Sequence, residues 1–195
     1  MSEMKIYTKI GDLGKTTFFG CGLVQKNDPR IEAFGALDEV NSVIGVTLCF
    51  IEDEKLRATL NKIQHDLFQL GSDIAGISLK QPVFPKITAE HVTELENIID
   101  GYHEKLGIPK NFILPGGTVS SSFLHMCRAT IRRAERIIVG LQQHVTNLNP
   151  EVIRYINRLS DLTFMLARHA NNELGIKEQQ PIYKYVNEHT ENKRS

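Results

Sequence analysis

Residues 120–141 read SSSFLHMCRATIRRAERIIVGL, and this stretch is the strongest indication of the fold class because it has a helical period. Apolar side chains recur along it every three or four residues, which predicts an amphipathic helix with one buried face. That apolar stripe consists of Cys127, Ile131, Ala134, Ile138 and Leu141.

The opposite face of the same helix carries Arg128, Arg132, Glu135 and Arg136, so three guanidinium groups project from one side within about two turns. The window 111–176 holds seven of the ten arginines of the chain and no lysine. A face that only contacts solvent would mix the two residues, whereas arginine alone favours bidentate recognition of phosphate or carboxylate. The alternative is a surface face or an ion-pair network between subunits, and this stretch leaves both open.

Composition limits the class of protein. A chain of 195 residues is long enough for one domain with a substantial core, and 41% hydrophobic and 24% charged residues are ordinary for a globular protein. The formal net charge of zero gives no general basic field, which argues against a nucleic-acid partner.

The three cysteines, Cys21, Cys49 and Cys127, form no CxxC pair and no zinc pattern. We expect them to be buried, reduced thiols of a cytoplasmic protein. The N-terminal residues show no leader, and no apolar run reaches membrane-spanning length, so no membrane partner is expected.

Four more helices are predicted from apolar periodicity and from start and stop signals, over residues 30–51, 52–76, 88–107 and 149–175. The chain is therefore expected to be all-α, an up-and-down five-helix bundle with almost no strand. One domain covers residues 1–185, and the polar tail 186–195 is expected to fray. The residues expected on or near the core side of the four helices are Ile31, Phe34, Leu37, Ile44 and Leu48; Leu56, Leu60, Ile63, Leu67, Leu70 and Ile74; Val92, Leu95, Ile98, Ile99, Tyr102 and Leu106; and Val152, Ile156, Leu159, Thr163, Leu166 and Ala170.

Metal and nucleophile motifs are missing from these helices. Di-iron bundles need Glu-x-x-His on two helices, and the sequence contains none. The seven histidines lack ligand spacing, and no Ser-His-Asp or Cys-His set can be assembled. We therefore expect no metal site made by protein side chains.

A glycine-rich segment precedes the first helix. Residues 11–22 hold four glycines, with one lysine and two threonines among them, and such a loop can wrap an anion with its backbone N–H groups. It is not a Walker A motif, because Gly11 and Gly14 enclose two residues and no helix follows directly. The alternative is an N-terminal turn that only caps the fold.

A second unusual segment is the connector 111–118, NFILPGGT. Pro-Gly-Gly ends any helix, and the apolar residues Phe112, Ile113 and Leu114 are uncommon in a connector. The segment is expected to be either a flap packed over the core or one wall of a ligand pocket.

Several motifs together resemble those of the PduO-type corrinoid adenosyltransferases, and the resemblance covers residues 5–185. It implies a ferritin-like helical bundle preceded by a phosphate-binding loop. The motifs are Tyr7-Thr-Lys-x-Gly-Asp-x-Gly-x-Thr, Phe34-Gly-x-x-Asp-Glu-x-Asn41, Phe112-x-Leu-Pro-Gly-Gly, Cys127-Arg-x-x-x-Arg-Arg-Ala-Glu-Arg136 and Asn157-Arg-Leu-Ser-Asp161.

The resemblance implies a transferase that moves the 5′-deoxyadenosyl group of ATP to the cobalt of cob(I)alamin, giving adenosylcobalamin and triphosphate. It implies a homotrimer with ATP between subunits, Mg²⁺ on the ATP phosphates, and a corrin reductase or a cobalamin-dependent mutase as possible partners. The cobalt is itself the nucleophile, which agrees with the lack of an activated serine or cysteine.

Site residues are carried over from the matching motifs. Asp38 and Arg128 match a pair that meets across the subunit interface, Phe112 matches an aromatic under the corrin that displaces the lower axial base, and Arg132 completes the catalytic set. Ile10 and Leu13 replace residues that are more often polar and basic, which removes two possible phosphate donors. The expected ATP contacts are Thr8, Lys9, Gly11, Thr16, Thr17, Lys26, Arg132, Glu135, Arg136 and Asn157.

Two other classes stay open. The same arginine faces could serve a helical polyphosphate-, nucleotide- or nucleic-acid-binding module without catalysis, although the net charge and the lack of an aromatic stacking platform argue against nucleic acid. The polar faces could also only join the subunits of a structural trimer, which would leave the glycine loop and the lysine-free window unexplained.

Overall fold

The structure is a computed structural model that describes residues 6–7, 9–18, 22–78 and 85–183. The predictions for Thr8, Cys21 and the tail 186–195 therefore fall outside the described residues.

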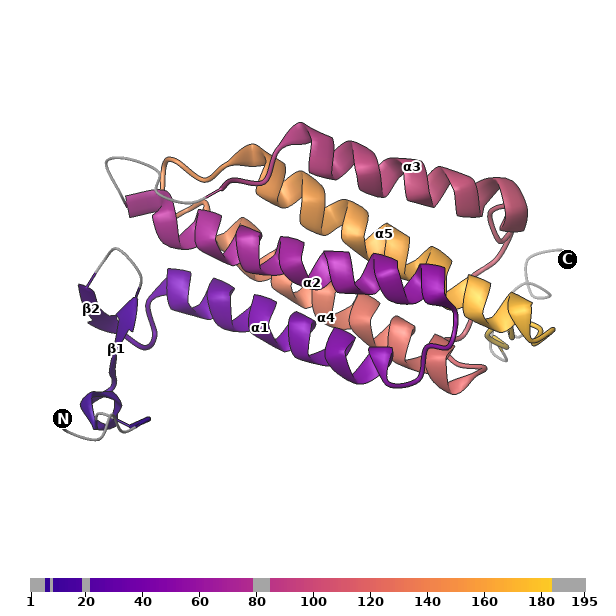
Figure 1. Cartoon of the computed structure of the whole chain (residues 1–195), viewed down its shortest axis with the longest axis horizontal. Coiled ribbons are helices and arrows are strands. Elements are labelled where there is room, and N and C mark those ends of the chain that lie inside the picture. The colour runs from indigo at the N-terminus through magenta and orange to yellow at the C-terminus, as the bar shows by residue number, and fades with distance from the viewer. Residues whose placement is uncertain (1–5, 8, 19–21, 79–84, 184–195) are drawn as a thin grey trace, which may run out of the picture.

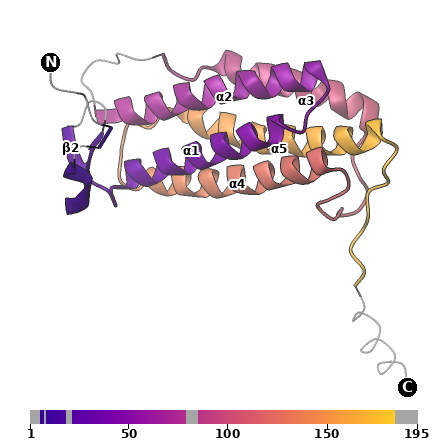
Figure 2. The same cartoon turned by 60° about the horizontal axis from the view of Figure 1, so that its bottom comes forward.

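Five long helices run side by side and form the bundle (Figures 1 and 2). Consecutive helices run in opposite directions, so the predicted all-α up-and-down bundle is confirmed (Figure 1). None of the described helices is both long and apolar enough to cross a membrane. The helices are α1 (Pro29–Leu48), α2 (Glu54–Ala75), α3 (Ala89–Leu106), α4 (Val119–Leu141) and α5 (Pro150–Glu173).

Capping residues explain where the helices begin. The side chain of Asp28 accepts a hydrogen bond from the Arg30 amide at 2.9 Å at the start of α1, and Asp53 plays the same part for α2. Asn149 caps α5, directly before a proline at the first helical position. Because these caps satisfy amide groups that have no partner inside the helix, the sequence fixes the helix starts to within about two residues.

The core lies between the helices, and the predicted core faces of α2, α4 and α5 are all buried. The prediction for α1 is wrong at Phe34, whose side chain is 40% exposed and packs edge-on against Phe18 at 5.9 Å between ring centroids. Two alanines, Ala33 and Ala36, take the buried positions instead. Their small side chains suit a close approach of α1 to its neighbours, which leaves the large ring of Phe34 at the edge.

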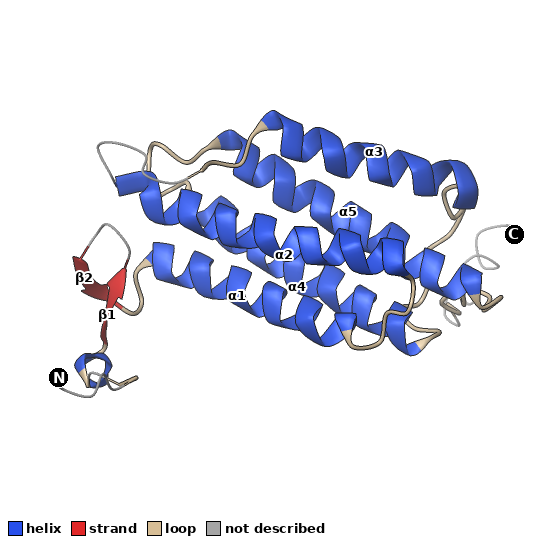
Figure 3. Ribbon diagram, viewed as in Figure 1, coloured by secondary structure: helices blue, strands red, loops and turns tan. Residues whose placement is uncertain are grey.

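The N-terminal segment differs from the expected flexible loop. A 3₁₀ turn at Ile10–Leu13 leads into a hairpin of β1 (Lys15–Phe18) and β2 (Gly22–Gln25), in which Thr16 lies opposite Val24 (Figure 3). The prediction of almost no strand overlooked this hairpin. The β-branched residues there favour an extended backbone, and the glycines masked that signal.

The cysteines are only partly as expected. Cys127 is buried, with its sulfur 3.2 Å from the Thr47 hydroxyl, and burial raises the pKa of its thiol to about 11. Cys49 is exposed, so the prediction of a buried thiol is wrong there. It is the C-cap residue of α1, at the start of the short turn that leads to α2.

Candidate functional site

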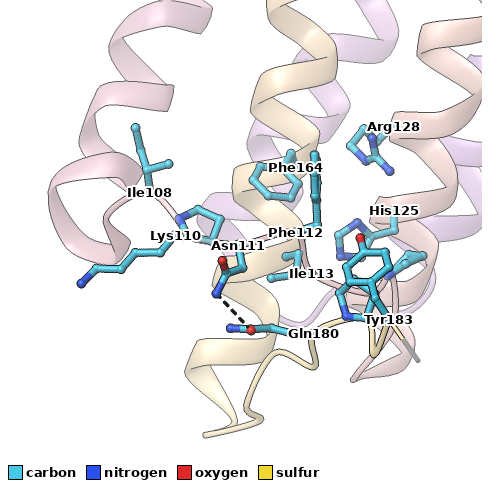
Figure 4. Close-up of a pocket in the computed structure, with 13 residues that line it drawn as sticks. Ile108, Lys110, Asn111, Phe112, Ile113, His125, Arg128, Phe164, Gln180 and Tyr183 are labelled. Atoms are coloured by element: carbon cyan, nitrogen blue, oxygen red, sulfur yellow. Dashed lines mark hydrogen bonds between the residues drawn. The ribbon is translucent and has the colours of Figure 1, made fainter. Parts of the chain in front are cut away.

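A pocket of about 740 Å³ opens at the end of the bundle where α3 ends and α4 begins (Figure 4). The connector between these helices forms one side of it, α4 and α5 form another, and the segment after α5 closes a third. Apolar side chains make up most of its wall, with a few polar groups among them. Its lining includes Ile108, Phe112, Ile113, His125, Arg128, Phe164 and Tyr183.

Phe112 projects into this pocket and does not cover the core. Its side chain is 82% exposed, so the interpretation of the connector as a flap over the core is wrong at this residue. Hydrogen bonds hold the connector instead: the Leu114 amide donates to the Gln179 carbonyl at 2.7 Å, and Asn111 donates to the Gln180 side chain at 3.1 Å. An exposed aromatic ring on a loop that is held by hydrogen bonds is more typical of a residue that lines a ligand pocket than of one that packs on the core.

The arginine face of α4 is divided between solvent and pocket. Arg132 and Arg136 are exposed, and Arg136 donates to the Arg132 carbonyl at 2.9 Å. Arg128 is half-buried beside the pocket, and its Nε has no hydrogen-bond partner among the described residues. Burial lowers the pKa of Arg128, and the neighbouring charge of Arg132 lowers it further. The guanidinium groups of this face are therefore available to bind a ligand or a partner.

Arg133 shows where the alternative interpretation holds. It forms an ion pair with Glu39 of α1, so one arginine of α4 does serve to join helices within the chain. Among the described residues, no ion pair of that kind involves Arg128, Arg132 or Arg136.

The predicted ATP contacts Glu135 and Asn157 are brought together across α4 and α5. The Asn157 amide donates to Glu135 at 2.9 Å, and its oxygen accepts from Arg158 at 2.8 Å. Arg158 also bonds Glu96 of α3 at 2.8 Å. Three helices thus fix the position of one amide side chain.

The predicted phosphate segment lies apart from the pocket. Within this segment, Gly11 and Lys26 lie close together, since a Cβ built on Gly11 would be 3.1 Å from the ammonium nitrogen of Lys26. Lys9, Thr17 and Lys26 are exposed and Thr16 is partly exposed. The hairpin stands at the end of the bundle where α1 begins, whereas the pocket lies at the opposite end (Figure 1). One chain therefore does not bring these residues to Phe112.

Asp38 is exposed on α1, where it borders a shallow hollow with Phe34, Asn41 and Phe68. None of the ion pairs found in the described part of the chain joins it to Arg128. No group of three histidine, cysteine or acidic side chains in the described residues is arranged to hold a metal ion.

His125 and Phe164 are among the pocket residues that sequence reasoning missed. His125 stands three residues before Arg128, so the helical period places both on one side of α4 and could have indicated it. Phe164 of α5 had no such signal, because neighbouring apolar residues hide a single lining ring in the sequence.

Together, the fold and the site define a helical-bundle protein with a largely apolar pocket at one end and an arginine face that suits an anion. Residues 6–170 match the family described as cobalamin adenosyltransferase. The chain belongs to this family and is thus an enzyme of the adenosyltransferase class, as the motifs indicated.

Individual relatives agree with this assignment. The chain is 42% identical over 177 residues to the corrinoid adenosyltransferase of Bacillus subtilis (strain 168), covering 89% of this chain and 90% of that relative. It is 40% identical over 173 residues to the corrinoid adenosyltransferase PduO of Salmonella typhimurium (strain LT2), covering 87% of this chain but 51% of that longer relative.

A solved structure shows the same fold. It is a variant of the PduO-type ATP:corrinoid adenosyltransferase from Lactobacillus reuteri, complexed with cobalamin and ATP. The TM-score is 0.85 at 39% sequence identity, and the match covers 92% of this chain and 100% of that one.

Proposed function

We propose that this chain transfers the 5′-deoxyadenosyl group of ATP to the cobalt of a reduced corrinoid and releases triphosphate. The observation that carries the proposal is the exposed ring of Phe112 in a largely apolar pocket beside the arginine face, in a chain of this family. A pocket of about 740 Å³ has the size of sites that enclose large organic ligands.

The reaction needs little acid–base chemistry from the protein. The electron pair of Co(I) attacks C5′ of ATP, a cobalt–carbon bond forms, and the bond from C5′ to the triphosphate oxygen breaks with its electrons on that oxygen. The chain contributes binding, orientation and exclusion of water. In this proposal Phe112 excludes water and the lower axial base from one face of the corrin, and a cobalt with fewer ligands is easier to reduce to Co(I).

Triphosphate is a strongly anionic leaving group, so donors fixed around it stabilise the charge that develops. In this proposal Arg132 and Arg136 supply guanidinium groups from α4, and Glu135 and Asn157 contact the nucleotide. The backbone and side chains of the N-terminal segment supply further donors, from Thr8, Lys9, Gly11, Thr16, Thr17 and Lys26.

A homotrimer with the site between subunits accounts for the distance between the hairpin and the pocket. Since the two lie at opposite ends of one bundle, a neighbouring subunit has to bring the phosphate segment to the rest of the site. Asp38 of one subunit and Arg128 of the next would pair at this interface, which supplies a partner for the buried Nε of Arg128.

The remaining features of the proposal follow from the substrates. Mg²⁺ would be held on the ATP phosphates, mostly by phosphate oxygens and water, as is usual for this ion. The enzyme would work in the cytoplasm, with a corrin reductase supplying Co(I) or a cobalamin-dependent mutase receiving the product.

The test is spectroscopic. Purified protein is added to ATP and chemically reduced cobalamin without oxygen, and we expect a light-sensitive alkylcobalamin together with an equal amount of triphosphate. ATP binding without any alkylcobalamin would instead support the non-catalytic nucleotide-binding module. A protein that binds no nucleotide would support the structural trimer.

A further inference from the structure

His125 is a buried polar side chain without a protein partner. The residue is 4% exposed, and neither ring nitrogen has a hydrogen-bond partner among the described residues. Its ring lies 6.2 Å from that of Phe164 in an edge-on arrangement, and both line the pocket that contains Phe112 (Figure 4). Since nearly all buried polar groups in folded proteins are hydrogen-bonded, such an exception asks for an explanation.

A ligand in the pocket can supply the missing partners. A neutral imidazole has one N–H donor and one nitrogen acceptor, so it fits a group that both accepts and donates. Burial lowers the pKa of His125 and the charge of Arg128 on the same helix lowers it further, while Glu178, after α5, acts in the opposite direction. Lys110 and Tyr183 are the other ionisable side chains that line this pocket. The imidazole is therefore neutral at neutral pH.

We propose that His125 determines which corrinoids are accepted, by exchanging hydrogen bonds with a carboxamide on the rim of the macrocycle. This inference rests on the proposed function, which places the corrin in the pocket. A carboxamide has both a carbonyl acceptor and N–H donors, whereas an ester or a carboxylate has acceptors only. His125 thus recognises the amidated form of the substrate. Phe112 and Phe164 contact the apolar surface of the corrin.

Binding of two corrinoids to several variants tests the proposal. The probes are cobinamide, whose rim carries amides, and cobyrinic acid heptamethyl ester, whose rim carries esters, both titrated calorimetrically in the presence of ATP. The variants are His125→Leu, which removes both hydrogen-bonding atoms, and His125→Gln, which keeps a donor and an acceptor. His65→Leu is the matched control, because His65 is exposed on α2 and does not line the pocket.

His125→Leu is expected to weaken cobinamide binding roughly tenfold more than ester binding, because the ester carbonyl can only accept from the imidazole N–H, whereas the carboxamide also donates to the other ring nitrogen. His125→Gln should recover most of the loss, and the control should bind both probes as the wild type does. The unfolding midpoint of His125→Leu without ligand should equal or exceed that of the wild type, since an unpaired buried group is removed. An equal loss for both probes, or a fall in the midpoint, would indicate a packing role and overturn the proposal.

A pH profile provides a second measurement. Protonated His125 is a donor only, so cobinamide affinity should fall as pH drops through the lowered pKa of this imidazole, below the ordinary histidine range of about 6.5. In His125→Gln this fall should disappear, whereas any contribution from the other charged groups stays. The two failures can be told apart: a wild type that forms no alkylcobalamin disproves the function, whereas an active wild type with unchanged cobinamide affinity in His125→Leu disproves only the role of His125.

Discussion

Gly117 and Asn171 lie against each other at the turn before α4, so closely that a Cβ built on Gly117 would be 2.2 Å from Oδ1 of Asn171. The buried amide of Asn171 holds both sides of this turn, since its nitrogen donates to the Gly116 carbonyl at 2.9 Å and its oxygen accepts from the Thr118 amide at 2.9 Å. One side chain of α5 thus sets the path of the connector that carries Phe112.

We expect Gly117→Ala to lower the free energy of unfolding by about 1–3 kcal/mol, because the backbone there has a positive φ of 109° and no room for a methyl group. Urea denaturation measures the change. Gly101→Ala is the matched control: this glycine lies inside α3 with nothing within 4 Å of a new Cβ, so the change should stabilise the protein by about 0.5–1 kcal/mol. Equal stability of Gly117→Ala and the wild type would mean that Asn171 does not fix the turn.

Helices were the most predictable part of the fold. Apolar spacing in α2 placed residues such as Leu60 and Leu67 in the core, and both are buried. Caps such as Asn149 with its following proline marked a start that the structure confirms. These signals are local, because each depends on residues within a few positions, and they hold whatever the helix packs against.

Features that depend on tertiary contact were less predictable. The helical spacing places Arg168 on a polar face of the last helix. In the structure it is buried and donates to the Gly107 carbonyl at 2.5 Å and to Glu178 at 2.8 Å. The sequence allows Phe112 to be a packing residue or part of a pocket wall, and its exposure in the structure separates the two. The sequence contains these residues, but Gly107 lies 61 positions from Arg168, and the pocket that Phe112 lines is built from several helices.

Arg132→Lys is expected to keep the fold and to lower turnover at least tenfold, about 1.4 kcal/mol of transition-state stabilisation. Arg132 is exposed, so its replacement leaves the core intact, and lysine keeps the charge but loses the planar fork that binds two phosphate oxygens. Steady-state kinetics with ATP and cob(I)alamin measures the effect. Arg154→Lys, a change to an exposed arginine of α5 paired with Glu151, is the control and should turn over normally. Wild-type rates in Arg132→Lys would show that Arg132 does not bind the phosphate oxygens in a bidentate way.

Phe112→Ala should leave the unfolding midpoint and ATP affinity nearly unchanged, because the ring is 82% exposed, while base-off cobalamin and turnover fall at least tenfold. Calorimetry, ATP titration and the cobalamin absorption spectrum measure these quantities separately. Leu166→Ala provides the contrast: Leu166 is fully buried, so this change should cost about 2–5 kcal/mol of stability, and activity should follow the folded fraction. If Phe112→Ala instead behaves like Leu166→Ala, or still forms base-off cobalamin, Phe112 does not displace the lower axial base.

Asp38 and Arg128 are expected to pair between subunits, so reversing either charge should reduce kcat/KM and reversing both should restore part of it. A double-mutant cycle with Asp38→Arg and Arg128→Asp should give a coupling energy of about 0.5–3 kcal/mol. Glu39→Arg combined with Arg128→Asp is the control, because Glu39 already pairs with Arg133 inside the chain. These two changes should be additive.

Co-expression of the two single variants shows whether the pair forms between subunits. In mixed oligomers, Arg at position 38 of one subunit meets Asp at position 128 of the next, and the reverse contact keeps the original Asp38 and Arg128. In the proposed trimer, each mixed oligomer then has two complementary contacts and one mismatched contact, whereas all three are mismatched in either variant alone, so mixed oligomers should be more active than either variant alone. A pair inside one chain could not be repaired in this way, because every single-variant chain would carry its own mismatch. Activity no higher than the average of the two variants would therefore disprove the contact between subunits.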